Sequence, residues 1–456
     1  MSDFLLSLSG NPMARKAVQT LGLPVPLPPN LRRASGPDPE RRLDGLEVVA
    51  LGADAAPTEA LAPLISATGA AGASVRYVRA HADAAADTAK TSAFVVDATG
   101  LTMPGDLRLL YDALHGRIGG LARSGRVVVL ARPESTTAAP GAAAAQAGVE
   151  GFVRALAKEL GRKGSTVNLL RIEAGAADHA AGPLLWMLSN RSAFVSGQPL
   201  VVRATSSAAS TDAGLRGKTA LVTGAARGIG AAIARRLAEQ GARPILLDLP
   251  AAADALDALA TDLGGVALPF DLAAAGATQA AAEAALARTG PIDILVNNAG
   301  ITRDRTLGKM PPQHWDLCLQ VNLEAAIGLT EAFLAEEGIT AGGRVVFLSS
   351  IGGIAGNPGQ TNYAASKRAL IGYAAALAPT LTAGRTANCI APGFIETQMT
   401  AAMPPLVREA GRRLNSLSQG GRPEDIADAI AFLASPAAAG VSGQTLRVCG
   451  QHLSGA

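Results

Sequence analysis

The sequence predicts an α/β protein with two doubly wound parallel sheets, each covered by helices on both faces. Short apolar runs alternate with longer alanine-rich, helix-compatible stretches along most of the 456 residues, as in parallel sheets with crossover helices. A chain of that length is too long to fold around a single hydrophobic core of ordinary size. Two phrases also recur in the same order: GRVVVL at 125–130 returns as GRVVFL at 343–348, and VSGQ at 195–198 returns at 441–444. The chain therefore contains two copies of one template.

Composition narrows the class of protein. Apolar residues make up 48% of the chain, charged residues 17%, and the formal net charge is +3. No long Lys/Arg run is present to follow a phosphate backbone, so we expect no nucleic-acid partner. The apolar run at the N-terminus is broken by Ser7, Ser9 and Gly10, which predicts neither a signal peptide nor a membrane span. Three widely spaced cysteines favour a reduced, cytoplasmic protein without a metal site.

The first half begins with a leader over residues 1–42, expected to form a helix and then a proline-rich extended strap at 23–29. The first α/β domain follows at 43–204, and a polar stretch of small residues at 205–214 has linker composition. We expect strands of the first domain at 48–51, 74–78, 93–96, 126–130, 167–172 and 199–202.

The second half, residues 215–456, repeats this scheme more clearly. Its apolar runs read as continuous stretches, which is typical of strands buried on both faces. Two of them carry a proline at or near an end, where a missing N–H costs least. We expect strands at 219–223, 244–248, 266–270, 292–297, 343–349, 386–391 and 444–449.

A glycine-rich turn joins the strand at 219–223 to the next helix. Gly224, Gly228 and Gly230 allow a tight turn, close approach of the backbone to a pyrophosphate, and packing of helix on strand. The helix N-terminus then faces the anion. This order of strand, turn and helix predicts a Rossmann-like dinucleotide site that also includes Arg227 and Ile229.

Asp248 ends the following strand and bears on the choice of cofactor. A carboxylate there accepts hydrogen bonds from the adenosine ribose hydroxyls and repels a 2'-phosphate, which favours NADH. Arg227 argues the other way, because it is placed to pair with that phosphate. We expect NADH, with NADPH as the alternative.

Polar residues that suit catalysis lie in the middle of the second half, between residues 297 and 367. Asn297–Gly300 closes one strand, Asn322 follows on a helix, and Ser350 closes another strand. Tyr363 and Lys367 lie four residues apart and share one helix face. A phenol titrates near pH 10, and a nearby ammonium favours its ionised form. Lys367 is therefore expected to lower the pKa of Tyr363.

With these motifs the second half resembles a short-chain dehydrogenase/reductase, and within that family the 3-oxoacyl-acyl-carrier-protein reductases. The motifs that carry the resemblance span residues 215–450: TGAARGIG at 223–230, NNAGITRD at 297–304, the residues Asn322, Ser350, Tyr363 and Lys367, APGFIET at 391–397 and GRPEDIA at 421–427. The whole chain is similar to the large two-domain type, whose N-terminal domain is described as flavodoxin-like.

The resemblance implies roles for individual residues. Tyr363 would donate a proton to the substrate carbonyl oxygen, and Ser350 would hydrogen-bond that oxygen. Lys367 would hold the nicotinamide ribose, and Asn322 would support a proton relay. Further cofactor contacts are implied at Asp271 and Leu272 beside adenine, at Asn298, Ala299 and Gly300 on the adenosine side, and at Pro392, Gly393, Ile395 and Thr397 at the nicotinamide end.

The segment from Thr397 to Gly421 lies where the family has its substrate lid. Its apolar residues, Met399, Met403, Leu406 and Val407, would cover an acyl chain or form the inner face of a static helix. Arg408, Arg412 and Arg413 are expected on a solvated helix face, with an anionic carrier as the alternative. The substrate form stays open between acyl-carrier protein and CoA. Alcohol, steroid or sugar dehydrogenases of the same fold and a nucleotide-sensing scaffold are the rival functions.

The first half lacks the catalytic residues when it is aligned with the second. Arg132, Ala142 and Gln146 fall where Ser350, Tyr363 and Lys367 stand, and Ala56 and Thr58 fall on Gly228 and Gly230. Other landmarks are shared: Gly52 falls on Gly224, Asp97–Gly100 on Asn297–Gly300, and Asn168 on Asn388. We therefore expect a degenerate copy that replaces one subunit of a tetramer, so that a homodimer forms a pseudo-tetramer.

Overall fold

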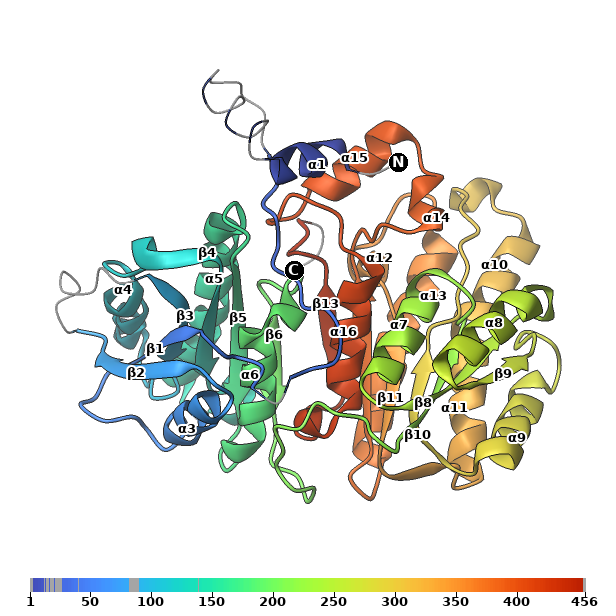
Figure 1. Cartoon of the computed structure of the whole chain (residues 1–456), viewed down its shortest axis with the longest axis horizontal. Helices are drawn as coiled ribbons and strands as arrows, with labels where there is room; N and C mark the ends of the chain where they lie inside the picture. Colours follow the sequence, from blue (N-terminus) through green and yellow to red (C-terminus); the bar gives the residue numbers. More distant parts are fainter. Residues whose placement is uncertain are drawn as a thin grey trace.

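The computed structural model describes residues 3–453 except 12, 14–15, 17–19, 21–26, 40, 82–89 and 138. Positions 23–26 of the predicted strap thus lie outside the described residues. The two halves form two parallel sheets placed side by side (Figure 1). The predicted α/β class with two parallel sheets is confirmed.

The first sheet has the strand order β2-β1-β3-β4-β5-β6, one of the two common doubly wound orders. All pairs are parallel. The strands are β1 (Glu47–Gly52), β2 (Ser74–Arg79), β3 (Thr91–Asp97), β4 (Leu121–Ala131), β5 (Thr166–Ile172) and β6 (Pro199–Val202). The helices around this sheet are α3 (Ala62–Ala70), α4 (Arg108–Leu114), α5 (Pro140–Gly161) and α6 (Ala181–Leu188).

The second sheet has the order β13-β12-β11-β10-β7-β8-β9. Its order reverses between β7 and β10, and ligands of open α/β sheets bind at such a switch point, outside the carboxyl ends of the strands. The strands are β7 (Thr219–Thr223), β8 (Arg243–Asp248), β9 (Val266–Pro269), β10 (Ile292–Asn297), β11 (Ile339–Leu348), β12 (Thr386–Pro392) and β13 (Thr445–Val448).

Helices cover both faces of the second sheet. One face is packed by α9 (Ala277–Thr289), α11 (Ala325–Ala335) and α13 (Thr361–Leu377). The other is packed by α7 (Gly228–Glu239), α8 (Ala253–Leu263) and α16 (Pro423–Ala434). The shorter helices are α10 (Pro312–Leu319), α12 (Ile351–Ala355), α14 (Gln398–Ala401) and α15 (Pro405–Arg413).

Two expected strands begin earlier than predicted, and in the same way. β4 starts at Leu121 instead of 126, and β11 at Ile339 instead of 343. In each case the register shifts at the start of the neighbouring strand. The chain turns there through a positive φ, at Ser124 and Gly342 respectively. The residues before each bulge lie outside the apolar run from which the strand was predicted, so the prediction began too late.

The halves meet through α6, β6, α16 and β13 (Figure 1). Trp186 stacks on Phe432 with ring centroids 4.4 Å apart, and each ring lies nine positions before its VSGQ segment. Gln444 Oε1 accepts from Val201 N at 2.7 Å, and its Nε2 donates to Val201 O at 2.6 Å. One buried apolar cluster continues across the junction, so the two sheets share a core.

The continuous helical stretch Pro312–Ala335 is long and apolar enough to span a membrane by length and composition. Its most apolar window is 44% buried inside the fold. Leu329 and Phe333 of this stretch belong to the core beneath the second sheet. A core helix passes the same length test, which makes the stretch weak evidence for a span.

Candidate active site

A cleft of about 1310 Å³ lies along the carboxyl ends of the strands of the second sheet. The glycine turn forms one end of its lining, and α14 and α15 contribute to the other. All predicted cofactor contacts line it: Gly224, Arg227, Gly228, Ile229, Asp248, Asp271, Leu272, Asn298, Ala299, Gly300, Tyr363, Lys367, Pro392, Gly393, Ile395 and Thr397. The cleft is larger than the range typical of a drug-sized ligand.

The geometry of the glycine turn fits a pyrophosphate. Gly224 has φ +64°, and a Cβ on Gly230 would lie 1.9 Å from Gly224 O. Neither position tolerates a side chain without rearrangement. Asn298 Nδ2 donates to Thr223 O at 2.8 Å and to Gly224 O at 3.0 Å, which fixes the turn to the end of β10. The close approach and the helix that opens at Gly228 form the cradle that a dinucleotide requires.

Asp248 is tied to the same turn. Its two carboxylate oxygens accept hydrogen bonds from Ala226 N at 2.9 Å and Leu249 N at 2.8 Å. Each oxygen still has a lone pair for a ribose hydroxyl. The acid that the sequence assigned to the ribose is therefore held rigidly at the edge of the cleft, together with Arg227.

Ser350, Tyr363 and Lys367 all line the cleft, and the side chains of Ser350 and Tyr363 are hydrogen-bonded to each other. Ser350 caps α12 by accepting from Gly352 N at 3.0 Å. Lys367 Nζ donates to Leu348 O at 2.7 Å, and burial lowers the pKa of Lys367 to about 8. An amine with a pKa this near neutrality is a usual mark of a functional site.

The prediction that Lys367 lowers the pKa of Tyr363 is wrong for this structure. Burial raises the pKa of Tyr363, and the hydrogen bond with Ser350 opposes that shift without reversing it. Lys367 Nζ lies 5.9 Å from the centre of the Tyr363 ring and donates to a backbone carbonyl instead. Loss of solvent is therefore the dominant influence on the phenol, and its pKa lies above the ordinary value instead of below it.

Asn322 lies behind the cleft and does not line it. It is fully buried in a π-helical turn, Gln320–Glu324, between α10 and α11, and such bulges are frequent at functional sites. Asn322 Oδ1 accepts from Ile301 N at 2.7 Å, and its Nδ2 donates to Ile301 O at 2.9 Å. A Cβ on Gly300 would lie 3.2 Å from Asn322 Oδ1 and 3.1 Å from Lys367 Nζ, so this glycine keeps the space between the two groups open.

The segment expected to cover the substrate lines the other end of the cleft. Met399, Met403 and Val407 are among its lining residues, whereas Leu406 is 86% exposed and does not contribute. The arginines of this segment were predicted wrongly. Arg408 and Arg412 are buried, not solvated, because Ala401 O and the Glu396 carboxylate accept their hydrogen bonds.

Three residues that sequence reasoning missed hold the site together. Ser349 Oγ donates to Lys367 O at 2.7 Å. Asn362, also fully buried, donates to Arg303 O at 3.1 Å and His314 O at 3.0 Å. Ser366 Oγ accepts from Asn322 at 3.1 Å. Each is the sequence neighbour of a predicted site residue, and this proximity is the only feature of the sequence that could have identified them.

A glycine turn, an acid on the second strand and a Ser, Tyr and Lys group on a parallel sheet define a nicotinamide-dependent oxidoreductase. The family model described as "Enoyl-(Acyl carrier protein) reductase" matches residues 224–450. Relatives support a family assignment. The 3-oxoacyl-acyl-carrier-protein reductase FabG of Vibrio cholerae is 42% identical over 239 residues, which cover 52% of this chain and 97% of that protein. The chain belongs to the short-chain dehydrogenase/reductase family.

Two further proteins are informative. The acetoacetyl-CoA reductase of Synechocystis is 42% identical over 241 residues, covering 52% of this chain and 98% of that protein. A blue fluorescent protein from a metagenomic library, solved in complex with NADPH, matches with 36% identity and a TM-score of 0.50. That match covers 53% of this chain and 99% of the other. These relatives are about half as long as this chain.

Proposed function

We propose that this protein reduces 3-oxoacyl thioesters to 3-hydroxyacyl thioesters with a nicotinamide cofactor. The observation that carries the proposal is the meeting of Ser350, Tyr363 and Lys367 in the cleft that also contains the glycine turn. The similarity to a 3-oxoacyl-acyl-carrier-protein reductase over 97% of that relative's length supports this substrate class.

Each residue then has a distinct role. NAD(P)H, when bound, supplies hydride to the substrate carbonyl carbon. Tyr363 is protonated at neutral pH, and it donates that proton to the carbonyl oxygen. The Ser350 hydroxyl hydrogen-bonds the same oxygen. Lys367 binds the nicotinamide ribose, and Asn322 supports the path that returns a proton to Tyr363.

For the cofactor we propose NADH, with NADPH as the competitor. Asp248 is held by two backbone amides at the edge of the cleft, so it cannot turn away from a 2'-phosphate at little cost. Arg227 lines the same cleft and offers that phosphate a partner. Kinetics with both cofactors decide the matter: a higher kcat/KM with NADPH would contradict the proposal.

The substrate is tested by comparing thioesters of different chemistry. We expect turnover of a graded series of 3-oxoacyl substrates on CoA and on acyl-carrier protein. A 2-enoyl thioester is the direct competitor, because the matching family model is described as an enoyl reductase. Faster turnover of the enoyl thioester, or of a steroid or sugar alcohol, would refute the assignment. No turnover of any of these would favour the nucleotide-sensing alternative.

We also propose that two chains form a homodimer in which each first half replaces a subunit. The support is the reciprocal junction within the chain: Arg203 N donates to Gly440 O, and Gly450 N donates to Phe194 O, both at 2.9 Å. Such near-symmetric exchange is typical of an isologous interface. Sedimentation equilibrium tests this, and a stable monomer would contradict it.

A further inference from the structure

Helix α15 packs with its charged side inward. Arg408 and Arg412 are buried, at 7% and 4% exposure, while Leu406 is 86% exposed and Val407 55%. An ordinary surface helix has the opposite arrangement. Leu406 and Val407 therefore bury little apolar area, and the polar contacts of the arginines add to the close packing of Gly411 against Phe394. We call residues 398–413, which comprise α14 and α15, the lid.

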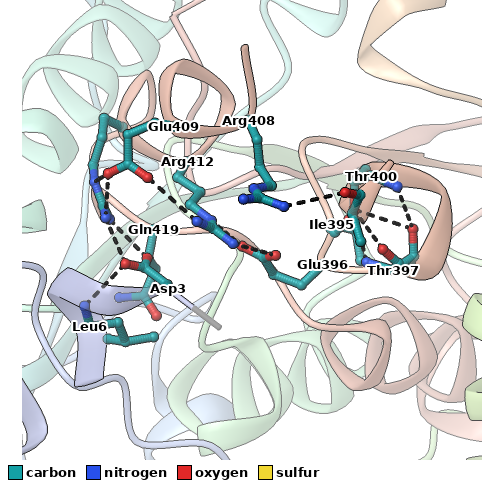
Figure 2. Close-up of polar contacts among 12 residues, drawn as sticks. Asp3, Leu6, Ile395, Glu396, Thr397, Thr400, Arg408, Glu409, Arg412 and Gln419 are labelled. Carbon is teal, nitrogen blue, oxygen red and sulfur yellow. Dashed lines mark hydrogen bonds and ion pairs between the residues drawn. The ribbon is translucent and has the colours of Figure 1, made fainter. Parts of the chain in front are cut away.

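Two of these polar contacts lie within the lid and the loop before it (Figure 2). Arg412 pairs with Glu396 through two hydrogen bonds, at 2.6 and 3.0 Å. Arg408 Nη1 donates to Ala401 O at 3.3 Å. Thr397 and Thr400 form a capping box at the start of α14. These bonds shape the lid and tie it to the loop before it, where Ile395 O also accepts from Thr400 Oγ1 at 2.7 Å.

Arg413, the last residue of the lid, donates to Glu409 Oε1 at 2.7 Å and to Ser418 O at 2.6 Å, and it also pairs with a residue from the other end of the chain. Arg413 Nη1 donates to Asp3 Oδ2 at 2.9 Å, and Arg413 Nη2 donates to Asp3 Oδ1 at 2.6 Å. Asp3 also caps α1 (Phe4–Gly10) by accepting from Leu6 N at 3.1 Å. Burial opposes ionisation of Asp3, but these hydrogen bonds outweigh it and lower the pKa of Asp3. The carboxylate is therefore charged at neutral pH.

The leader is itself fixed to the body of the protein. Pro29 O accepts from Gln419 Nε2 at 2.6 Å, and Arg33 pairs with Asp425 at 2.8 and 2.9 Å. Farther along, Asp38 accepts from Arg191 at 2.6 Å and from Arg236 at 3.0 Å, and these two arginines belong to different halves. Figure 1 shows α1 beside α15. Asn30 Nδ2 donates to Ser9 O of α1 at 3.3 Å, so the described parts of the leader connect the lid to the junction of the two halves.

We infer that Asp3 is a positioning residue for the substrate lid: its ion pair with Arg413 holds α15 over the acyl end of the cleft. The inference rests on the proposed function, because Met399, Met403 and Val407 of the lid line that cleft. A bidentate carboxylate–guanidinium pair fixes orientation as well as distance. Loss of the pair loosens the lid and weakens substrate binding, while the cofactor turn stays intact.

The test is Asp3→Asn in the full-length chain. Asparagine caps a helix as well as aspartate does, so α1 keeps its cap and only the charge is lost. We expect KM for a 3-oxoacyl thioester to rise about three- to tenfold, the range for loss of a partly buried ion pair. We expect kcat within about twofold of wild type and an unchanged Kd for the reduced cofactor. Hydrogen exchange of residues 398–413, measured by mass spectrometry, should become faster.

The matched control is Asp44→Asn. Asp44 lies just after the leader in an exposed pair with Arg41, at 3.1 Å, so this variant loses the same charge away from the lid. It should behave as wild type in both measurements. In an Arg413→Gln background, Asp3→Asn should add nothing, because its partner is already gone.

The two measurements separate this inference from the proposed function. Unchanged exchange of the lid in Asp3→Asn would overturn the inference, whatever the substrate proves to be. Faster exchange with an unchanged KM would also overturn it, while leaving the reductase assignment standing. If the wild-type protein turns over no 3-oxoacyl thioester, the proposed function fails, and the exchange comparison still decides whether Asp3 holds the lid.

Discussion

The two halves keep the same contacts at their shared junction and differ at the edge where a cofactor binds. Asn168 donates to Val195 O at 3.0 Å and accepts from Gln198 N at 3.1 Å. Asn388 donates to Val441 O at 2.9 Å and accepts from Gln444 N at 3.1 Å. The repeat was thus retained where it builds the shared core. We infer that the first half is kept for its surface.

At the other edge, side chains of the first half fill the space that a cofactor would need. A Cβ on Gly52 would lie 2.5 Å from the Tyr77 hydroxyl, which donates to Asp54 O at 2.9 Å. Thr58, in the place of Gly230, donates to Asp97 at 2.5 Å. Gln146, in the place of Lys367, donates to Leu101 O at 3.0 Å and accepts from Arg132 N at 2.8 Å. In the first half, internal hydrogen bonds thus engage the positions that match the proposed cofactor site of the second half.

The largest expected difference between the halves is in catalysis. Tyr363→Phe should lower kcat by about 10²- to 10⁴-fold, because the general acid is lost, and should leave cofactor affinity largely intact. Tyr77→Phe removes a hydroxyl from the first half and should leave kcat unchanged. Steady-state kinetics of both variants check this. Retention of most activity in Tyr363→Phe would refute its assigned role.

At the junction, equivalent substitutions in the two halves should lower the stability of the protein by similar amounts. Asn168→Ala and Asn388→Ala each remove two buried side-chain hydrogen bonds, and each should lower the free energy of unfolding by about 2–3 kcal/mol. Because one buried cluster spans both halves, we expect a single unfolding transition. Denaturant titration followed by circular dichroism measures both quantities. Two separate transitions would show that the halves do not share a core.

A last, pH-dependent effect concerns the charge at the position shared by Lys367 and Gln146. Burial lowers the pKa of Lys367 to about 8, whereas an unfolded lysine titrates near pH 10.4. Between these values the folded state loses its proton first, so stability rises with pH; below about pH 8 both states are charged and burial of the ammonium is unfavourable. Relative to Lys367→Gln, the wild-type Tm should therefore rise from pH 8 to 10. The prediction fails if the Tm of the wild type minus that of Lys367→Gln stays constant or falls over this pH range.

Local patterns predicted the sheets and the lining of the cleft, because these depend on residues close in sequence. The glycine turn and the Tyr363–Lys367 pair are examples. The patterns did not predict the inward arginines of α15, since a charged helix face looks the same whether water or Glu396 satisfies it. They also did not predict the pairing of Asp3 with Arg413, because 410 positions separate the two residues. Nor do they weigh burial against charge at Tyr363.

The central claim is that only the second half binds a nicotinamide cofactor, and calorimetric titration with NADH tests it most directly. We expect one site per chain in the wild-type protein. Gly230→Ala should abolish that site, because the added Cβ would lie 1.9 Å from Gly224 O. The control Gly151→Ala, on α5 with nothing within 4 Å of an added Cβ, should keep it. Two sites per chain, or one site that survives Gly230→Ala, would contradict the account.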